Sequence, residues 1–359
     1  MLTVARACQA RAHEVIIFTS DWQGEKPTDM HIVELPVTAL SNHGRAQAFV
    51  LRLQEQLRKL PRATVIGFNK MPGLDVYYAA DVCFAAKAFE ERNFFYRLTA
   101  RSRNYLALEK SVFARDSNTE VLMISKTQIG VYQRYYQTPD ERLHLLPPGI
   151  RRDCVMPADY AAQRKQLRAQ FNIDDNVFQI LFVGSDYQRK GLDRVLRGIA
   201  ALSEALRSRV RLWVAGQDKA TTFQNLARTL GIENQISFLG PRDDIPQLMW
   251  SADLLLHPAY SEAAGLVLLE AIAAGLPVIA SRVCGHAHYI VEHNMGVTLN
   301  DPITPDEVAD AIMSVLAQPR EIWLERSRQT VMNADIFSMP ERAVNIIEAV
   351  AKKLGRGKA

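Results

Sequence analysis

The sequence is poor in cysteine, has no long apolar run and carries little net charge. Its four cysteines (Cys8, Cys83, Cys154 and Cys284) are scattered without a Cys-x-x-Cys pair, which favours reduced thiols in a cytosolic protein. No stretch reaches the ~18 consecutive apolar residues of a membrane-spanning helix. The 43 basic and 39 acidic residues leave a net charge of +4, which is too small an excess for a dedicated nucleic-acid-binding protein.

Several common site motifs are also absent. The sequence contains no Gly-x-Gly-x-x-Gly after a strand-like run, no Gly-x-x-x-x-Gly-Lys-[Ser/Thr] and no Gly-x-Ser-x-Gly, so dinucleotide binding is poorly supported. His286 and His288 have a metal-like spacing, but no third ligand is evident in the sequence. We therefore interpret these two histidines as loop or packing residues.

The sequence does contain a regular alternation of short apolar runs and helix-like stretches over 359 residues, a length typical of two domains. Most runs are continuous rather than alternating, which predicts strands buried on both faces of a parallel sheet. The predicted fold class is doubly wound α/β. The predicted strands are Val15–Thr19, Ile32–Leu35, Thr64–Phe68, Val82–Phe84, Val121–Ser125, Leu143–Leu146, Gln179–Val183, Leu212–Ala215, Ile236–Leu239, Leu254–His257, Val278–Ala280 and Val297–Leu299.

A domain boundary is predicted at Pro147-Pro148-Gly149, because adjacent prolines interrupt regular structure. The boundary separates an N-terminal domain of residues 1–150 from a C-terminal domain of residues 151–339. Residues 340–359 hold a last helix that we expect to pack back on the N-terminal domain. The predicted helices include Leu2–Ala12, Ala46–Leu60, Asp193–Ser203, Thr222–Leu230, Asp306–Ala317 and Pro340–Leu354.

The most informative segment is Glu-Ala-Ala-Gly-Leu-Val-Leu-Leu-Glu, from Glu262 to Glu270, which follows a predicted strand. A helix that begins near Gly265 would direct free N–H groups and its positive dipole end at an anion. On one helix the two glutamates would be about 12 Å apart along the axis and rotated by roughly 80°. They could then bracket a ligand that has hydroxyls at both ends and a phosphate between them. The alternative is an amphipathic helix with two solvated glutamates.

A second segment, Val183–Gly191, contains Gly184 and the adjacent cations Arg189 and Lys190. Such a turn at the carboxyl end of a strand suits a pyrophosphate, because open α/β sheets bind ligands at that edge. A solvated basic turn is the alternative. The turn Gly240-Pro241-Arg242-Asp243 is a weaker candidate, which could hold a nucleotide base.

With these segments the chain resembles the retaining GT-B glycosyltransferases that carry the Glu-x7-Glu motif. Longer stretches are similar to the lipopolysaccharide core glucosyltransferase I family (the WaaG type), namely Ser41–Arg45, Gly67–Tyr77, Leu145–Gly149, Gly216–Lys219 and His257–Tyr260. The resemblance covers nearly the whole chain and implies two Rossmann-like domains that face a cleft. It also implies transfer of glucose, with retention, from UDP-glucose to an inner-core heptose of a lipid-anchored oligosaccharide. No metal and no other cofactor is implied.

The resemblance further implies roles for individual residues. Glu262 would lie by the donor sugar, Glu270 would hold the ribose, and Asp81 would lie near the reaction centre. Arg189 and Lys190 would stabilise the departing diphosphate, so that Glu262, Asp81, Arg189 and Lys190 form the implied catalytic set. Retention would follow a same-face displacement, with a covalent intermediate as the alternative. The implied donor-binding residues are Gly184, Arg189, Lys190, Arg242, Glu262, Ala263, Ala264, Gly265, Leu266, Val267 and Glu270.

The beginning of the sequence departs from the pattern of this family. Members of this family begin with a strand and a Gly-Gly loop, whereas this sequence opens with the helix-like Leu2–Ala12. We therefore expect the N-terminal domain to lack its first strand and that loop, and we favour a true start upstream of Met1 over an impaired form. A related glycosyltransferase with another donor or acceptor, or a non-catalytic form, are the other readings of the sequence.

Residues Phe84–Arg115 combine seven cations with only three carboxylates and interleave them with aromatic residues. A basic helical stretch with aromatic anchors is typical of binding to an anionic membrane surface. That surface suits a lipid-borne acceptor and a peripheral location on the cytoplasmic face of the inner membrane, although an ordinary solvated helix is the alternative. Single-stranded nucleic-acid sites have a similar composition, but no RNA-binding motif is present and no nucleic acid is expected. The expected membrane-facing cations are Lys87, Arg92, Arg97, Arg101, Arg103 and Lys110.

Overall fold

The structure is a computed structural model that describes residues 1–60 and 63–356. The chain divides into two compact units. Unit 1 consists of Met1–Pro147 together with the C-terminal segment that starts at Ser338, and unit 2 consists of Pro148–Phe337. Both units contain parallel strands connected by helices, which confirms the predicted α/β class.

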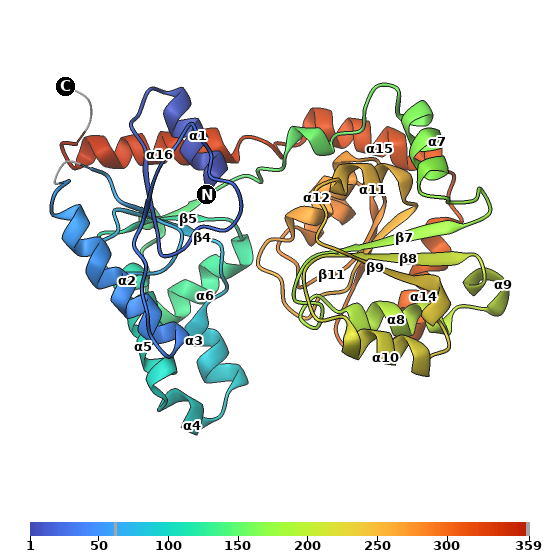
Figure 1. Cartoon of the computed structure of the whole chain (residues 1–359), viewed down its shortest axis with the longest axis horizontal. Coiled ribbons are helices and arrows are strands. Elements are labelled where there is room, and N and C mark those ends of the chain that lie inside the picture. The colour runs from blue at the N-terminus through green and yellow to red at the C-terminus, as the bar shows by residue number, and fades with distance from the viewer. Residues whose placement is uncertain (61–62, 357–359) are drawn as a thin grey trace. The chain divides into compact units, whose positions relative to one another are not determined.

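Unit 2 is built on a six-stranded parallel sheet with the strand order β12-β11-β10-β7-β8-β9. This is the doubly wound order. Successive strands are added on one side of β7 up to β9 and then on its other side from β10 onward, and such sheets bind ligands at the carboxyl ends of the strands beside this switch point. Continuous apolar runs such as Ile180–Phe182 are fully buried because helices cover both faces of the sheet (Figure 1). The strands are β7 (Phe178–Val183), β8 (Val210–Ala215), β9 (Ile236–Gly240), β10 (Leu254–His257), β11 (Val278–Ser281) and β12 (Gly296–Leu299).

The helices of unit 2 lie on the two sides of this sheet. Helices α8, α10 and α14 cover one face, and α7, α11 and α12 cover the other (Figure 1). The α-helices are α7 (Tyr160–Gln170), α8 (Leu192–Ala201), α9 (Glu204–Arg207), α10 (Thr221–Thr229), α11 (Ile245–Ser251), α12 (Leu266–Ala273), α13 (Ala287–Glu292), α14 (Pro305–Leu316) and α15 (Arg320–Asn333). The short 3-10 helices are η3 (Arg152–Cys154) and η4 (Glu233–Gln235).

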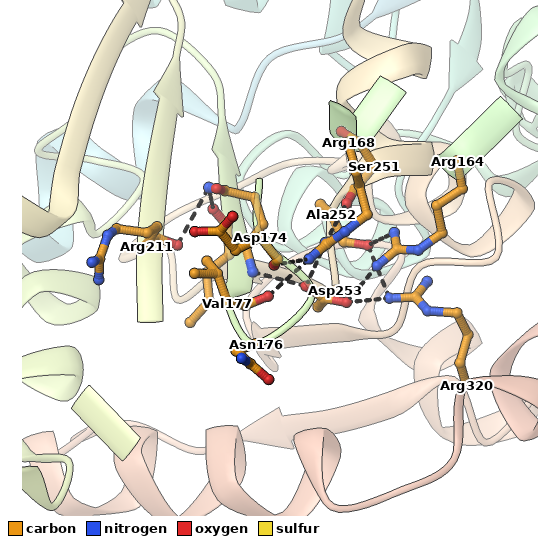
Figure 2. Close-up of polar contacts among 12 residues, drawn as sticks. Arg164, Arg168, Asp174, Asn176, Val177, Arg211, Ser251, Ala252, Asp253 and Arg320 are labelled. Carbon is orange, nitrogen blue, oxygen red and sulfur yellow. Dashed lines mark hydrogen bonds and ion pairs between the residues drawn. The ribbon is translucent and has the colours of Figure 1, made fainter. Parts of the chain in front are cut away.

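A cluster of charges anchors two of these helices at the amino ends of the strands. Asp253, immediately before β10, forms ion pairs with Arg164 and Arg168 of α7 and with Arg320 of α15 (Figure 2). The Arg164 guanidinium lies 2.6 Å from the carboxylate, and the N–H of Gln179 in β7 also donates to it at 2.8 Å. The remaining guanidinium donors bond to backbone carbonyls, so this buried cluster has hydrogen-bond partners on all sides.

Unit 1 contains two separate parallel sheets. One pairs β1 (Ile16–Thr19) with β2 (His31–Glu34). The other has the order β3-β4-β5-β6, with the strands β3 (Ile66–Gly67), β4 (Val76–Ala79), β5 (Glu120–Met123) and β6 (Leu143–Leu145). No strand among the described residues joins the two sheets, and β1 and β3 both line one cavity of about 1820 Å³. The strands of this unit are thus divided between two sheets.

The C-terminal helix packs within unit 1. Helix α16 lies beside α1 (Figure 1), where Val4 and Val344 share a buried apolar cluster and Arg11 Nη1 lies 2.9 Å from Glu348 Oε2. The α-helices of unit 1 are α1 (Leu2–Ala10), α2 (Asn42–Leu57), α3 (Phe84–Ala86), α4 (Phe94–Arg97), α5 (Ala100–Phe113), α6 (Lys126–Tyr136) and α16 (Met339–Lys353). A π-helical turn, η1 (Lys87–Glu91), continues α3, and η2 (Asp140–Arg142) is a 3-10 turn.

One strand prediction is wrong. Residues Val82–Phe84 form no strand, and the strand before them is β4, which the sequence analysis missed. The N–H groups of Phe84 and Ala85 donate to the buried Glu109 carboxylate at 2.8 and 2.9 Å, so these groups cannot join a ladder. The other predicted strands correspond to β-strands with shifts of one to two residues at their ends.

Candidate active site

The loop that carries Glu262 leads from the carboxyl end of β10 into α12. It is held against the turn after β11, because Glu262 forms a parallel bridge with Cys284 and the N–H of His286 donates to the Ala264 carbonyl at 2.8 Å. Gly265 precedes the first residue of α12 in the left-handed conformation, with φ of 77°, which glycine adopts without strain. The predicted helix start near Gly265 is confirmed. Glu262 lies before that helix and Glu270 within it, so the helical spacing of about 12 Å calculated for the two glutamates does not apply.

The two segments that the sequence analysis singled out meet at one carboxylate. Arg189 Nη1 lies 3.4 Å and Lys190 Nζ lies 3.3 Å from Glu262 Oε2. The same Arg189 nitrogen donates to the Ser261 carbonyl at 2.8 Å, while Nε donates to Asp186 at 2.9 Å. The N–H of Tyr260 donates to the Arg189 carbonyl, which joins the two loops through the backbone as well.

Gly184 directly follows β7 at the start of this basic turn. Because it has no side chain, it leaves room for Lys190. Its φ is 142°, and a Cβ at this position would lie 2.5 Å from Lys190 Cδ and 2.7 Å from Nζ. The Lys190 side chain thus passes directly over the Gly184 backbone on its way to Glu262. The sequence analysis placed Gly184 in the donor site, and the structure shows that its missing side chain shapes the path of Lys190.

His257 is a site residue that the sequence analysis missed. It ends β10, is fully buried, and places Nε2 3.8 Å from Glu262 Oε2. Neither ring nitrogen has a hydrogen-bond partner among the described residues, and burial lowers the pKa of the imidazole. The available signal was a histidine that closes an otherwise apolar strand, five residues before Glu262.

Glu262 is an anion at neutral pH. Burial by itself would raise the pKa of its carboxyl group, but His257, Lys190 and Arg189 outweigh that effect and lower the pKa to about 2. Glu270, inside α12, behaves in the opposite way, because burial raises the pKa of its carboxyl group. The two glutamates of the motif therefore differ in environment, and only Glu262 contacts the two cations.

The other predicted donor-binding residues fall into two groups, one next to Glu262 and one apart from it. Ala263, Ala264 and Gly265 form the loop between Glu262 and α12, and Leu266 and Val267 are the first two residues of that helix. Arg242, in contrast, turns to Asp244, with Nε 2.8 Å from Oδ1. No contact among the described residues joins Arg242 to Glu262, Arg189 or Lys190.

Asp81 lies in unit 1, in the loop after β4. Two side chains hold the backbone of this loop: Tyr132 Oη donates to the Asp81 carbonyl at 3.1 Å and Lys70 Nζ donates to the Val82 carbonyl at 3.3 Å. Lys70 also forms an ion pair with the fully buried Glu109. The Asp81 side chain itself is exposed and lines the cavity of unit 1.

The basic aromatic segment Phe84–Arg115 forms α3, η1, α4 and α5, so its predicted helical character is confirmed. Phe94 and Phe95 are 62% and 77% exposed, which is unusual for such large apolar side chains. The Arg97 guanidinium donates hydrogen bonds to the carbonyls of Ala88 and Phe89. In the part of the chain that the structure describes, no helix combines the length and the apolar character needed to cross a membrane.

His286 and His288 lie at the start of α13. The His286 ring packs against Tyr289, and burial, together with His288, lowers the pKa of His286 to about 4. Within residues 1–60 and 63–356, no group of three or more His, Cys, Asp or Glu side chains is arranged to hold a metal ion.

Comparison with known proteins shows that the chain is similar to glycosyltransferases. Residues 163–335 match the family described as glycosyl transferases group 1. The chain is 42% identical over 348 residues to the lipopolysaccharide glucosyltransferase WaaG of Escherichia coli (strain K12), covering 96% of this chain and 93% of that protein. It is 29% identical over 246 residues to a D-inositol 3-phosphate glycosyltransferase of Segniliparus rotundus, which corresponds to 66% of this chain and 53% of that protein.

Solved structures give the same picture. A crystal structure of WaaG superposes with a TM-score of 0.93 and 42% identity, over 96% of this chain and 94% of that chain. HepE from Anabaena, solved in complex with UDP and glucose, superposes with a TM-score of 0.73 over 97% of this chain and 95% of its own. Because HepE is only 17% identical, it shows the fold alone. These neighbours confirm the predicted GT-B fold.

Proposed function

The chain belongs to the group 1 glycosyltransferases and, within them, to the lipopolysaccharide glucosyltransferase family, and we propose that it transfers glucose from UDP-glucose to an inner-core heptose of lipopolysaccharide. The transfer would proceed with retention of configuration and without a metal or other cofactor. The observation that carries the proposal is the convergence of Arg189 and Lys190 on Glu262 beside the start of α12. Full-length similarity to a lipopolysaccharide glucosyltransferase supports the acceptor class.

The cations and the helix would bind the donor's diphosphate. Arg189 and Lys190 share the Glu262 carboxylate in the structure, and Arg189 is also paired with Asp186 at the surface. A diphosphate carries more negative charge than one carboxylate and would attract both cations, aided by the free N–H groups at the start of α12. Glu262 would then be free to accept hydrogen bonds from the hydroxyls of the donor glucose, while Glu270 would do the same for the ribose.

The proposed transfer of glucose needs no nucleophilic side chain. The bond between the anomeric carbon and the β-phosphate oxygen breaks, and the acceptor hydroxyl oxygen bonds to the same face of that carbon. The hydroxyl proton passes to the departing phosphate oxygen. Arg189 and Lys190 would stabilise the negative charge that grows on the diphosphate as it leaves, which is where fixed cations accelerate such a reaction most. Asp81 would lie by the acceptor hydroxyl.

A lipid-borne acceptor calls for a protein that reaches the membrane surface. We propose that the segment Phe84–Arg115 makes this contact from the cytoplasmic side, with Phe94 and Phe95 as apolar anchors. Their exposure supports this role, since exposed aromatic side chains beside cations are typical of helices that lie at a lipid interface. The exposed cations Arg103 and Lys110 of α5 would add attraction to anionic lipids.

The test is a transfer assay with the purified chain, UDP-glucose and a heptose-terminated core oligosaccharide. We expect an acceptor that gains one glucose by mass spectrometry, with an α linkage by NMR, and a panel of other UDP-sugars that are used poorly. E262Q is expected to lose transfer while it still binds UDP in a calorimeter. UDP binding without any transfer would contradict the enzymatic proposal and favour a non-catalytic binding protein.

A further inference from the structure

The cavity of unit 1 is lined by more cations than carboxylates. Its carboxylates are Glu14, Asp81 and Glu348. Four of its cations are Arg45 of α2, Lys87 of η1, Arg92, which follows η1, and Arg101 of α5. All four cations have exposed side chains, and none forms an ion pair within the described residues. In contrast, Lys70, which lines the same cavity, is already neutralised by Glu109. The wall to which these four unpaired cations belong therefore carries an excess of positive charge.

Helix geometry places Arg101 on a different side of α5 from the other two cations of that helix. At 100° per residue, Arg101, Tyr105 and Leu108 of α5 lie on one side of the helix, and all three line the cavity. Arg103 and Lys110 lie about 180° to 200° away from Arg101 and do not line it. Of the six cations that composition alone assigned to the membrane, Lys87, Arg92 and Arg101 thus line the cavity, whereas Arg97, Arg103 and Lys110 do not.

Aromatic rings hold two of the guanidinium groups of the cavity wall. The Arg92 guanidinium carbon lies 5.6 Å from the centre of the Tyr96 ring, and that of Arg101 lies 5.9 Å from the centre of the Tyr105 ring. A guanidinium on a ring face keeps its N–H donors in the plane free for an anion. The ring faces also suit the apolar faces of a sugar, so the wall combines the contacts that an anionic saccharide requires.

We propose that this wall binds a phosphate or carboxylate group of the acceptor saccharide next to the hydroxyl that receives glucose. The inference rests on the proposed function and adds that the acceptor is recognised as an anion. Lys87, Arg92 and Arg101 are assigned to this saccharide site, which leaves Arg103 and Lys110 for the membrane surface. An uncharged saccharide would leave the four unpaired cations without counterparts in the cavity.

The experiment uses soluble acceptors, so that binding to vesicles does not contribute. Wild-type chain is assayed with a heptose disaccharide, its monophosphate and a carboxylate-bearing analogue, all with UDP-glucose. We expect a KM at least ~10-fold lower for an anionic acceptor than for the neutral one, because charge-assisted hydrogen bonds form only with the anion. The comparison of phosphate with carboxylate identifies which anion the site prefers.

Two variants with equal changes in net charge separate a local site from the general field of the protein. K87Q/R92Q/R101Q is expected to raise the KM for the anionic acceptors by at least ~10-fold and to leave the neutral acceptor within about threefold. R115Q/K126Q/K352Q removes three exposed cations of unit 1 that do not line the cavity, and it is expected to behave as wild type. K87R/R92K/R101K keeps the charges and is expected to retain the preference.

The outcomes distinguish this inference from the proposed function. Transfer to all acceptors with equal KM would overturn the anion site and leave the glucosyltransferase proposal intact. Equal effects of the two triple variants would also overturn it, because a general electrostatic field would then explain the preference. Failure of transfer to every acceptor, with UDP still bound, would overturn the proposed function itself. Thermal unfolding of each variant shows whether a changed KM follows from misfolding.

Discussion

Lys190 reaches Glu262 by crossing the backbone of Gly184, and its ammonium nitrogen ends 3.3 Å from the carboxylate. This relationship joins the two loops that follow β7 and β10, the strands between which the order of the sheet reverses. His257, Lys190 and Arg189 together keep the pKa of Glu262 low, so that the carboxyl group is ionised inside a largely buried site. Changes at either residue, or at the glycine between them, therefore test how the site is assembled.

A side chain at position 184 should displace Lys190. In G184A the new Cβ would overlap Lys190 Cδ and Nζ, and we expect transfer to fall at least ~10-fold, a loss of roughly 1.4 kcal/mol or more in transition-state stabilisation. G231A is the control for alanine at a positive φ, since Gly231 has a φ of 69° and a Cβ there meets nothing within 4 Å. Steady-state rates and thermal unfolding are measured for both. Equal losses of activity in the two variants would show that backbone strain, not the path of Lys190, causes the effect.

The lowered pKa of Glu262 predicts a pH-dependent contribution to stability. A carboxyl group whose pKa is lower in the folded than in the unfolded state stabilises the fold above the unfolded value, near 4.5, and that contribution disappears as the pH falls toward about 2. We expect E262Q to be less stable than wild type by up to ~3 kcal/mol at pH 7 and by less at pH 3.5. Urea unfolding at both pH values measures the difference. A gap that stays constant between pH 7 and pH 3.5 would refute the assignment of an ionised Glu262.

The Asp253 cluster should be a main source of stability in unit 2. D253N removes the single negative charge that Arg164, Arg168 and Arg320 share, and leaving buried cations without their counterion typically costs about 3–5 kcal/mol. Urea unfolding is expected to show a loss of that size. D310N, at an exposed position of α14, is the control and should change stability by less than about 0.5 kcal/mol. A loss below about 1 kcal/mol in D253N would mean that the backbone carbonyls alone satisfy the three guanidiniums.

Membrane binding should depend on the outward side of α5. R103Q/K110Q removes two cations that do not line the cavity, and at ~1 kcal/mol for each charge we expect binding to anionic vesicles to weaken roughly 30-fold. Binding of wild-type chain should weaken with added salt and be absent for neutral vesicles. K126Q/K352Q, with the same change in charge elsewhere on unit 1, is the control in a co-sedimentation assay. If neutral and anionic vesicles bound the wild-type chain equally, the electrostatic part of the proposal would be wrong.

Patterns local to the sequence predicted much of this molecule. Continuous apolar runs located most of the strands, because a run that is buried on both faces needs no information from distant residues. They failed at Val82–Phe84, where the side chain of Glu109, 25 residues away from Phe84, takes the backbone donors of the segment. The segments around Arg189 and Glu262 could likewise be singled out from their residue types, since a glycine and adjacent cations after a strand form a recognisable local pattern.

The sequence by itself determined the α/β class, the position of the basic turn and the presence of a helix start after Glu262, since each depends on neighbours within one turn or one strand. Only the tertiary structure decided that Lys190 contacts a carboxylate 72 residues away, that His257 lies buried behind it, and that Lys87, Arg92 and Arg101 share a cavity with Asp81. These relationships depend on strand order and helix rotation, which place side chains together across distances that no local pattern records.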